Sequence, residues 1–377
     1  MRVCGDPLMK QSDVAFFRLS PPSHSSIEVV WLTLRESVLR GMKMAKRLYI
    51  GIDLGTFQST IASSAGGLDT METVVGKPKD PVARNFLGRD VLFGADALKN
   101  KLACNLFRPM AAGVAQDDEG NLAAAKAFVT HLIDTVDPED YDEVFGVICS
   151  PSHITFTDKS NLVATLRGQV NAIMVVSEPF ATAFGLEEIG GSIVVDIGAG
   201  TTDIARIYGT FPSEDDEDTL SHAGDWIDVE LMDLIEKKYT GAQLTKDMTR
   251  GWKEQYSYVG DEDRECMVEL SVEGKKQVVD IGDLVREACE SAMPHIVSGI
   301  KAVVATADPE YQPVLRNNII LSGGGSLIDG VAGRIADELS DIGDVNVWCC
   351  DDPITKVATG ALKLAEAMPD EQYTSIN

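Results

Sequence analysis

The 377-residue sequence has few of the residues that support transition-metal chemistry or a disulfide framework. It contains only five histidines and no HExxH motif, which argues against a transition-metal site. Its seven cysteines are an odd number without a CxxC pair, so we interpret them as reduced cytosolic thiols, mostly in the core. No apolar run approaches the roughly 20 residues of a membrane-spanning helix. We therefore expect a cytoplasmic protein with no transmembrane segment.

Basic residues are also scarce. There are 33 Lys and Arg against 59 Asp and Glu, which gives a formal net charge of -26. Such a surface repels nucleic acid and anionic lipid, so we expect no direct contact with nucleic acid. Hydrophobic residues make up 44% and charged residues 24% of the chain, as in soluble globular proteins. The length allows two domains with substantial cores.

Residues 192–209, SIVVDIGAGTTDIARIYG, are typical of a strand, a tight glycine turn and a second strand. Gly198 and Gly200 allow the backbone N–H groups to approach phosphate oxygens. Asp196 precedes the turn, where a carboxylate can hold a hydrated magnesium ion. The alternative is an ordinary hairpin with a solvated aspartate.

A second stretch repeats this pattern. Residues 49–61, YIGIDLGTFQSTI, again combine an apolar strand, an aspartate (Asp53) and a Gly-Thr turn. Two such hairpins suggest a duplicated domain that grips phosphates between its halves. The sequence contains no GxxxxGK[ST] motif, and its glycine turns lead into strands where a dinucleotide fingerprint requires a helix.

Strands and helices alternate along the chain, which indicates the α/β class. A buried strand at 173–176 is followed by Glu178 and Pro179, so the Glu178 carboxylate should project from a strand end into the cleft. There it could orient a water molecule for phosphoryl transfer, with Asp196 as the competing candidate. The alternative is that Glu178 only stabilises a helix N-terminus. We also expect a solvated loop at 213–218 and a long helix at 283–306 that is interrupted at Pro294.

The first 46 residues differ from the rest of the chain. The sequence following Met42 and Met44 has the character of a natural start, so we interpret the preceding residues as an over-extended gene prediction or a disordered tail. Residues 27–40 carry a short apolar stripe, but the polar face is not rich in Lys or Arg, as a membrane-surface helix would require.

Five stretches taken together resemble the actin, Hsp70 and sugar-kinase ATPase superfamily. They are DLGT at 53–56, SEP at 177–179, DIGAGTTD at 196–203, KEQY at 253–256 and SGGGS at 322–326. The resemblance covers the chain from about residue 47. It implies an actin-like ATPase fold with two duplicated RNase H-like domains and a nucleotide cleft between them.

Within this superfamily the chain is most similar to the prokaryotic actins. SEPFATAFG at 177–185 and DDPITKVATG at 351–360 resemble MreB, the latter at the stretch that closes the hinge. VVGKPKD at 74–80, KEQYSYVG at 253–260 and the segment 362–369 are more similar to the magnetosome-aligning actins. The resemblance implies ATP hydrolysis and a head-to-tail homopolymer, with magnetosome-associated proteins as partners.

The resemblance also implies roles for individual residues. Asp53 and Asp196 would hold Mg²⁺, largely through water, and Lys253 with Glu254 would meet the adenine and ribose of ATP or ADP. Gly323, Gly324, Gly325 and Ser326 would pass under the nucleoside at the N-terminus of the following helix. The residues implied to surround the phosphates are Gly55, Thr56, Phe57, Gly198, Gly200, Thr201 and Thr202. Phe57 and Gln58 stand where relatives often carry small or polar residues.

The expected organisation follows from the same resemblance. Domain I would span 47–178 with an inserted subdomain at about 73–118, and domain II would span 179–340 with an insertion at about 225–282. Residues 341–377 would return to domain I. Three alternatives to a magnetosome filament remain at this point. They are an MreB-like cell-shape or plasmid-segregation filament, a small-molecule kinase of the same fold, and a protein that binds ATP without hydrolysing it.

Overall fold

The computed structural model describes residues 45–111, 114–115 and 119–376, and the unit discussed below begins at Lys46. The interpretation of residues 1–44 as an over-extended start or a tail therefore lies outside the described residues.

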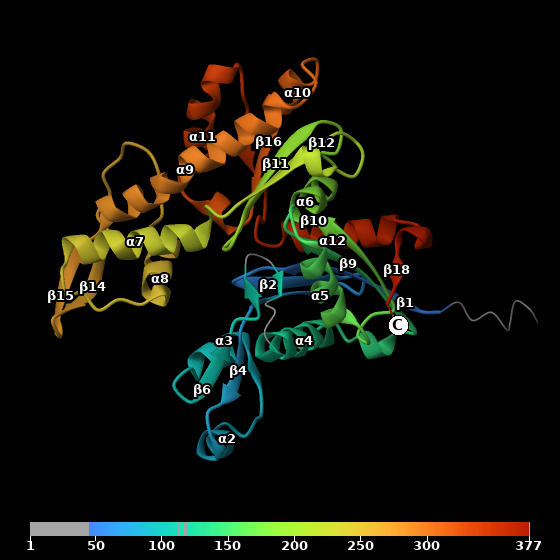
Figure 1. The fold of residues 1–377 in the computed structure, drawn as a ribbon, viewed down its shortest axis with the longest axis horizontal. Helices are drawn as coiled ribbons and strands as arrows, with labels where there is room; N and C mark the ends of the chain where they lie inside the picture. The colour runs from blue at the N-terminus through green and yellow to red at the C-terminus, as the bar shows by residue number, and fades with distance from the viewer. Residues whose placement is uncertain (1–44, 112–113, 116–118, 377) are drawn as a thin grey trace, which may run out of the picture. The chain divides into compact units, whose positions relative to one another are not determined.

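Sheet one has six strands in the order β18-β10-β9-β1-β2-β3 (Figure 1). Its central strand β1 pairs antiparallel with β2 and parallel with β9. The apolar side chains Leu48, Ile50 and Ile52 of β1 are fully buried, which fixes the register of the sheet. The strands are β1 (Arg47–Leu54), β2 (Gln58–Ser63), β3 (Leu68–Glu72), β9 (Glu143–Ser150), β10 (Ala172–Ser177) and β18 (Thr374–Ser375).

Sheet two repeats this arrangement with five strands in the order β13-β12-β11-β16-β17. Its central strand β11 pairs antiparallel with β12 and parallel with β16, as β1 does with β2 and β9. The two glycine turns therefore occupy equivalent positions in two like sheets. The strands are β11 (Ser192–Ile197), β12 (Thr202–Ile207), β13 (Glu217–Leu220), β16 (Ile319–Ser322) and β17 (Val347–Cys349). Repeated sheets with helices confirm the predicted α/β class.

Two helices, α6 (Glu178–Leu186) and α12 (Lys356–Ala367), share one hydrophobic core with strands of both sheets. Their contact is close because it is made through glycines. A Cβ atom at Gly360 of α12 would lie 2.0 Å from the carbonyl oxygen of Ala181 in α6. A Cβ atom at Gly51 of β1 would lie 2.3 Å from the carbonyl oxygen of Ala358. Neither position has room for a larger residue.

The outer faces of the sheets are covered by the remaining long helices. Sheet one packs against α4 (Glu119–Asp134) and α5 (Phe156–Leu166), and sheet two packs against α7 (Gly224–Lys238), α9 (Gly282–Ala305) and α11 (Val331–Leu339). Among the described residues, no helix is both long and apolar enough to cross a membrane.

The prediction that Pro294 interrupts the long helix is wrong, because α9 runs through it without a break. Proline removes one backbone donor, but Met293 and Ile296 on either side of it are completely buried. Packing of this apolar face therefore outweighs the lost hydrogen bond.

The acidic run at 213–218 is also more ordered than predicted. It forms a short 3₁₀ turn (Glu214–Asp216) and the start of β13, which pairs with β12. Asp216 accepts a hydrogen bond of 2.6 Å from Arg206, a side chain that lies almost completely inside the protein. This partner gives the acidic segment a fixed position.

Two insertions extend from the sheets. The first contains β4 (Val75–Pro78), β5 (Leu92–Phe93), β6 (Cys104–Phe107), α2 (Pro81–Leu87) and α3 (Gly94–Lys99) around a small core of its own. The second contains α8 (Lys246–Tyr256) and the hairpin β14 (Met267–Val272) and β15 (Lys275–Asp280). Three further short elements are β7 (Met110–Ala111), β8 (Val114–Ala115) and α10 (Gln312–Arg316). The domain boundaries given above stay predictions.

Candidate functional site

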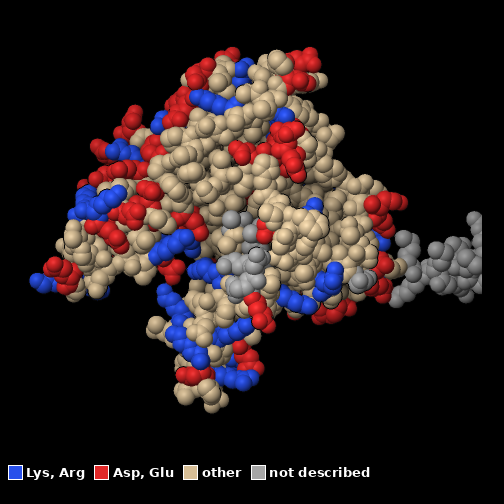
Figure 2. Space-filling view, in the orientation of Figure 1, with Lys and Arg blue, Asp and Glu red and all other residues tan. Residues whose placement is uncertain are grey.

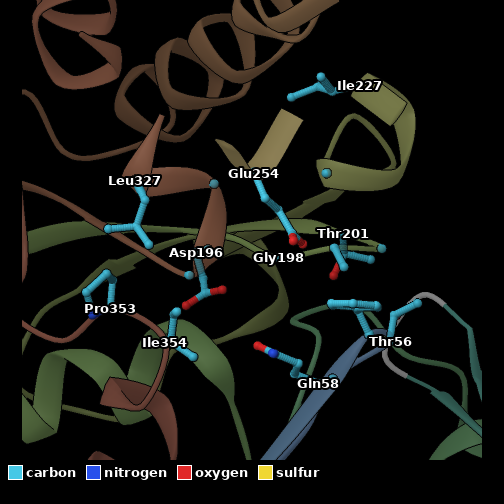
Figure 3. Close-up of a pocket in the computed structure, with 18 of the residues that line it drawn as sticks. Thr56, Gln58, Asp196, Gly198, Thr201, Ile227, Glu254, Leu327, Pro353 and Ile354 are labelled. Carbon is cyan, nitrogen blue, oxygen red and sulfur yellow. The ribbon is translucent and has the colours of Figure 1, made fainter. Parts of the chain in front are cut away.

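A cavity of about 410 Å³ lies where the two glycine turns meet α8 and the loops after β16 and β17. Its lining includes most of the residues that the sequence singled out. These are Asp53, Gly55, Thr56, Phe57, Glu178, Asp196, Gly198, Gly200, Thr201, Lys253, Glu254, Gly323, Gly324 and Gly325. Figure 3 shows Thr56, Gln58, Asp196, Thr201 and Glu254 turned toward a common space.

The first turn joins β1 to β2 and is shaped by Gly55. A Cβ atom on Gly55 would lie 2.3 Å from the carbonyl oxygen of Gln58, so only glycine fits there. Asp53 stands near the end of β1 and lines the cavity. Burial, together with the negative charge of Asp196, raises the pKa of Asp53 to about 8.

The second turn joins β11 to β12 and is held by the start of α7. The N–H of Gly198 donates to the carbonyl oxygen of Thr201 at 2.9 Å, and the N–H of Gly224 donates to the carbonyl oxygen of Gly198 at 3.0 Å. Asp225 makes a similar bond of 2.7 Å to Ala199. These bonds fix the turn in a shape that leaves Gly200 and Thr201 at the cavity.

Buried carboxylates gather beneath the turns. Burial raises the pKa of Asp196 to about 7, against the hydrogen bond from Ser322, and Asp203 adds to the rise. Glu178 is 8% exposed and begins α6 directly after β10. Its pKa lies well above the ordinary value because it is buried and because Asp203, Asp53 and Asp196 are also negative.

Within the described part of the chain, these carboxylates have no positively charged partner. Among the described residues, no Lys, Arg or His forms a salt bridge with Asp53, Asp196 or Glu178. A bound cation would supply the missing charge, and aspartate oxygens suit Mg²⁺. Within the described part of the chain, no three His, Cys, Asp or Glu side chains are grouped to enclose a metal. The residues therefore fit an ion that keeps its waters and takes further oxygens from phosphates.

The adenine side of the predicted site is formed by α8. Lys253 on this helix forms bonds of 2.7 Å with both Asp228 and the carbonyl oxygen of Gly224, so its ammonium is held by its own half of the protein. Glu254 projects into the cavity (Figure 3). Pro353, Ile354 and Leu327 add an apolar part to the lining of the same cavity (Figure 3).

The triple-glycine segment follows β16 as expected, and packing requires glycine at two of its three positions, Gly323 and Gly325. A Cβ atom on Gly325 would lie 2.2 Å from Cγ2 of Ile197, and Gly323 has a positive φ of 74°. The expectation of a helix start here needs correction. Gly324 and Gly325 lie within a four-residue 3₁₀ turn (Gly324–Leu327), and α11 begins only at Val331 after Gly330, which also has a positive φ. The dipole of α11 therefore does not begin at these glycines.

Two predicted residues lie behind the cavity wall. The Thr202 hydroxyl donates to the carbonyl oxygen of His222 at 2.8 Å, and Ser326 donates to the carbonyl oxygen of Gly323 at 2.7 Å. Both side chains are buried and support the turns from inside.

Sequence reasoning missed several residues of the lining. Arg250 precedes Lys253 by three residues on α8, so helical spacing could have indicated that both lie on one face. Gly224 precedes an acidic residue at a helix start, which is a weaker signal. The others are Gln58, Ala199, Ile227, Ser257, Leu327, Ile328, Pro353, Ile354 and Val357.

The sheets, the paired turns and the cavity between them define an actin-like fold. The chain matches the model of the MreB/Mbl protein family over residues 47–372 and belongs to that family. It is 34% identical to the actin-like protein MamK of Paramagnetospirillum magneticum strain AMB-1, over 88% of this chain and 95% of that protein.

Solved structures of MamK are similar to this fold. A MamK double helical filament superposes with a TM-score of 0.84 at 35% identity, covering 86% of this chain and all of that one. A non-polymerising MamK mutant bound to AMPPNP gives a TM-score of 0.67 at 34% identity, covering 85% of this chain and 99% of that one.

Proposed function

We propose that this protein is a bacterial actin that binds and hydrolyses ATP and polymerises head-to-tail into cytoplasmic filaments. The observation that carries this proposal is the pair of equivalent glycine turns with Asp53 and Asp196 lining one cavity. The similarity to MamK supports the same proposal, since one MamK structure is a filament and a MamK mutant structure contains AMPPNP.

Residues of the cavity lining would have separate roles in binding and hydrolysing ATP. Backbone N–H groups of the two turns would hold the β- and γ-phosphates, and Asp53 and Asp196 would hold Mg²⁺ through water. The metal would neutralise phosphate charge. Glu178 would accept a hydrogen bond from the attacking water and orient it toward the γ-phosphate. Lys253 and Glu254 would border the adenine and ribose.

The deciding experiment combines sedimentation with phosphate release. Purified protein is pelleted with and without Mg-ATP, and phosphate is measured without any added acceptor substrate. We expect ATP-dependent pelleting and steady phosphate release. Monomeric protein at tens of micromolar with ATP, seen by light scattering and electron microscopy, would end the filament proposal. Phosphate transfer only to an added sugar or acid would point to a kinase.

For the cellular role we propose that the filament organises or positions magnetosomes, through magnetosome-associated proteins. The similarity to MamK of a magnetotactic bacterium supports this. The gene should restore an ordered magnetosome chain in a magnetotactic strain that lacks its own MamK. Restored cell shape in an MreB-depleted strain, without an effect on magnetosomes, would favour the MreB-like role instead.

A further inference from the structure

The first insertion contacts α8, the helix that carries Arg250, Lys253 and Glu254 of the cavity lining. Lys101 Nζ lies 3.4 Å from Asp247 Oδ2, and Arg108 Nη2 lies 3.6 Å from Asp247 Oδ1. Asp247 is in the first turn of α8, whereas Lys101 and Arg108 flank β6. Figure 2 shows Lys and Arg side chains gathered over the first insertion and along its border with α8, on a molecule whose net charge is strongly negative.

Phe57, which lines the cavity, makes a second contact with α8. The Arg250 guanidinium lies 4.1 Å from the centroid of the Phe57 ring, and the Arg108 guanidinium lies 5.9 Å from it. Phe57 belongs to the first glycine turn and Arg250 to α8. A cation over an aromatic face is attracted to it, most strongly where water is excluded.

Arg250 is held in place for this contact from the other side. Its side chain is 9% exposed, Nη2 lies 2.6 Å from Asp225, and Nε lies 3.1 Å from Asp228. Asp228 is fully buried and also accepts Lys253. The position of Arg250 is therefore tied to that of Lys253, one turn further along the cavity wall.

The TM-scores separate the two kinds of MamK structure. Two filament structures give 0.84 and 0.76, whereas the non-polymerising mutant gives 0.67 at nearly the same identity. The fold as a whole therefore superposes more closely on the filament structures than on the non-polymerising mutant.

We propose that Phe57 and Asp247 are positioning residues of a clasp that holds α8 over the cavity and slows the departure of nucleotide. The proposal rests on the proposed function, since it takes nucleotide as the occupant of the cavity. Phe57 contributes more than Asp247, because the exposed side chains of Lys101 and Asp247 are screened by water. A nucleotide enclosed by both halves cannot leave until these contacts part.

The first test measures release of a fluorescent ATP analogue, chased with excess Mg-ATP, from protein diluted below its assembly concentration. Phe57→Leu removes the aromatic face and keeps apolar volume, and we expect about fivefold faster release. Phe57→Tyr keeps the face and should release at close to the wild-type rate. Equal acceleration by both variants would overturn the role of the aromatic face.

The second test reverses the charge of Asp247, a residue outside the cavity lining. Asp247→Lys should accelerate release by about two- to threefold, and adding Lys101→Glu should recover part of the wild-type rate. Glu269→Lys is the matched control, since this exposed acid pairs with Lys276 in the β14–β15 hairpin and makes the same charge change. The effect of Asp247→Lys should shrink at high ionic strength, while that of Phe57→Leu should persist.

Failure of the clasp and failure of the proposed function give different results. If the wild-type protein binds no ATP analogue, the proposed function fails. If it binds the analogue and neither Phe57→Leu nor Asp247→Lys changes the release rate, the clasp is refuted and nucleotide binding stands. A lower melting temperature of Phe57→Leu with unchanged release would show a purely structural contact and would also refute the clasp.

Discussion

Asp53 and Asp196 stand on equivalent hairpins, and each is desolvated beside other acids. The pKa of Asp53 rises to about 8, so its negatively charged form is disfavoured in the protein without ligand. The same charge is what a magnesium–phosphate cluster requires. The same buried aspartates that attract the cation therefore destabilise the protein when no cation is bound.

We predict that Asp53→Asn weakens binding of Mg-ATP by at least about tenfold, because the amide keeps the volume and loses the charge. Without nucleotide, this variant should melt no lower than the wild type. Calorimetric titration with and without EDTA measures the first effect, and thermal unfolding measures the second. Magnesium-dependent affinity equal to that of the wild type would contradict the metal role.

The prediction for Glu178 concerns rate. Glu178→Ala should fold, bind ATP and assemble, but hydrolyse ATP at least about tenfold more slowly, since alanine has no oxygen to accept a hydrogen bond from the attacking water. Phosphate release under single-turnover conditions measures this. Unchanged hydrolysis with a lowered melting temperature would instead assign Glu178 the role of stabilising the N-terminus of α6.

At the scale of elements, the contact of α12 with α6 depends on Gly360. We expect Gly360→Ala to lower the free energy of unfolding by about 1–3 kcal/mol, because the new methyl group would overlap the carbonyl oxygen of Ala181. Denaturant unfolding measures this effect.

Gly333 in α11 provides the matched control. A Cβ atom there meets nothing within 4 Å, so Gly333→Ala should stabilise the protein by about 0.5–1 kcal/mol through helix propensity. Stabilisation by both substitutions would mean that α12 shifts freely on α6.

A feature of the fold or of the candidate site could be predicted from the sequence where its interacting residues lie close together along the chain. The glycine turns could be predicted because the aspartate, the glycines and the flanking apolar residues lie within a few positions of one another. The contact of Phe57 with Arg250 could not be predicted, since it joins segments far apart in the chain. The inward orientation of Thr202 likewise depends on His222, which comes from the loop after β13. Local spacing cannot show which hydroxyl faces the cavity.

For the whole molecule, the net charge of -26 opposes any association of identical subunits. We predict that the critical concentration for assembly with Mg-ATP falls severalfold as monovalent salt rises from about 20 to about 150 mM, because salt screens this repulsion. Light scattering at several protein concentrations measures it. Weaker assembly at the higher salt concentration would show that attractive charge pairs dominate the contact between subunits.

The position of α12 has a consequence for biosynthesis. This helix shares a core with both sheets, and its glycine lies against Ala181, yet it is translated long after β1, β9 and β10. While sheet two emerges from the ribosome, the apolar face that awaits α12 has no cover. Domains ordinarily fold as units during synthesis, but here the first half must wait for a late helix. Translation order therefore delays the completion of the first sheet, and the nascent chain is the state in which we expect it to need chaperones most.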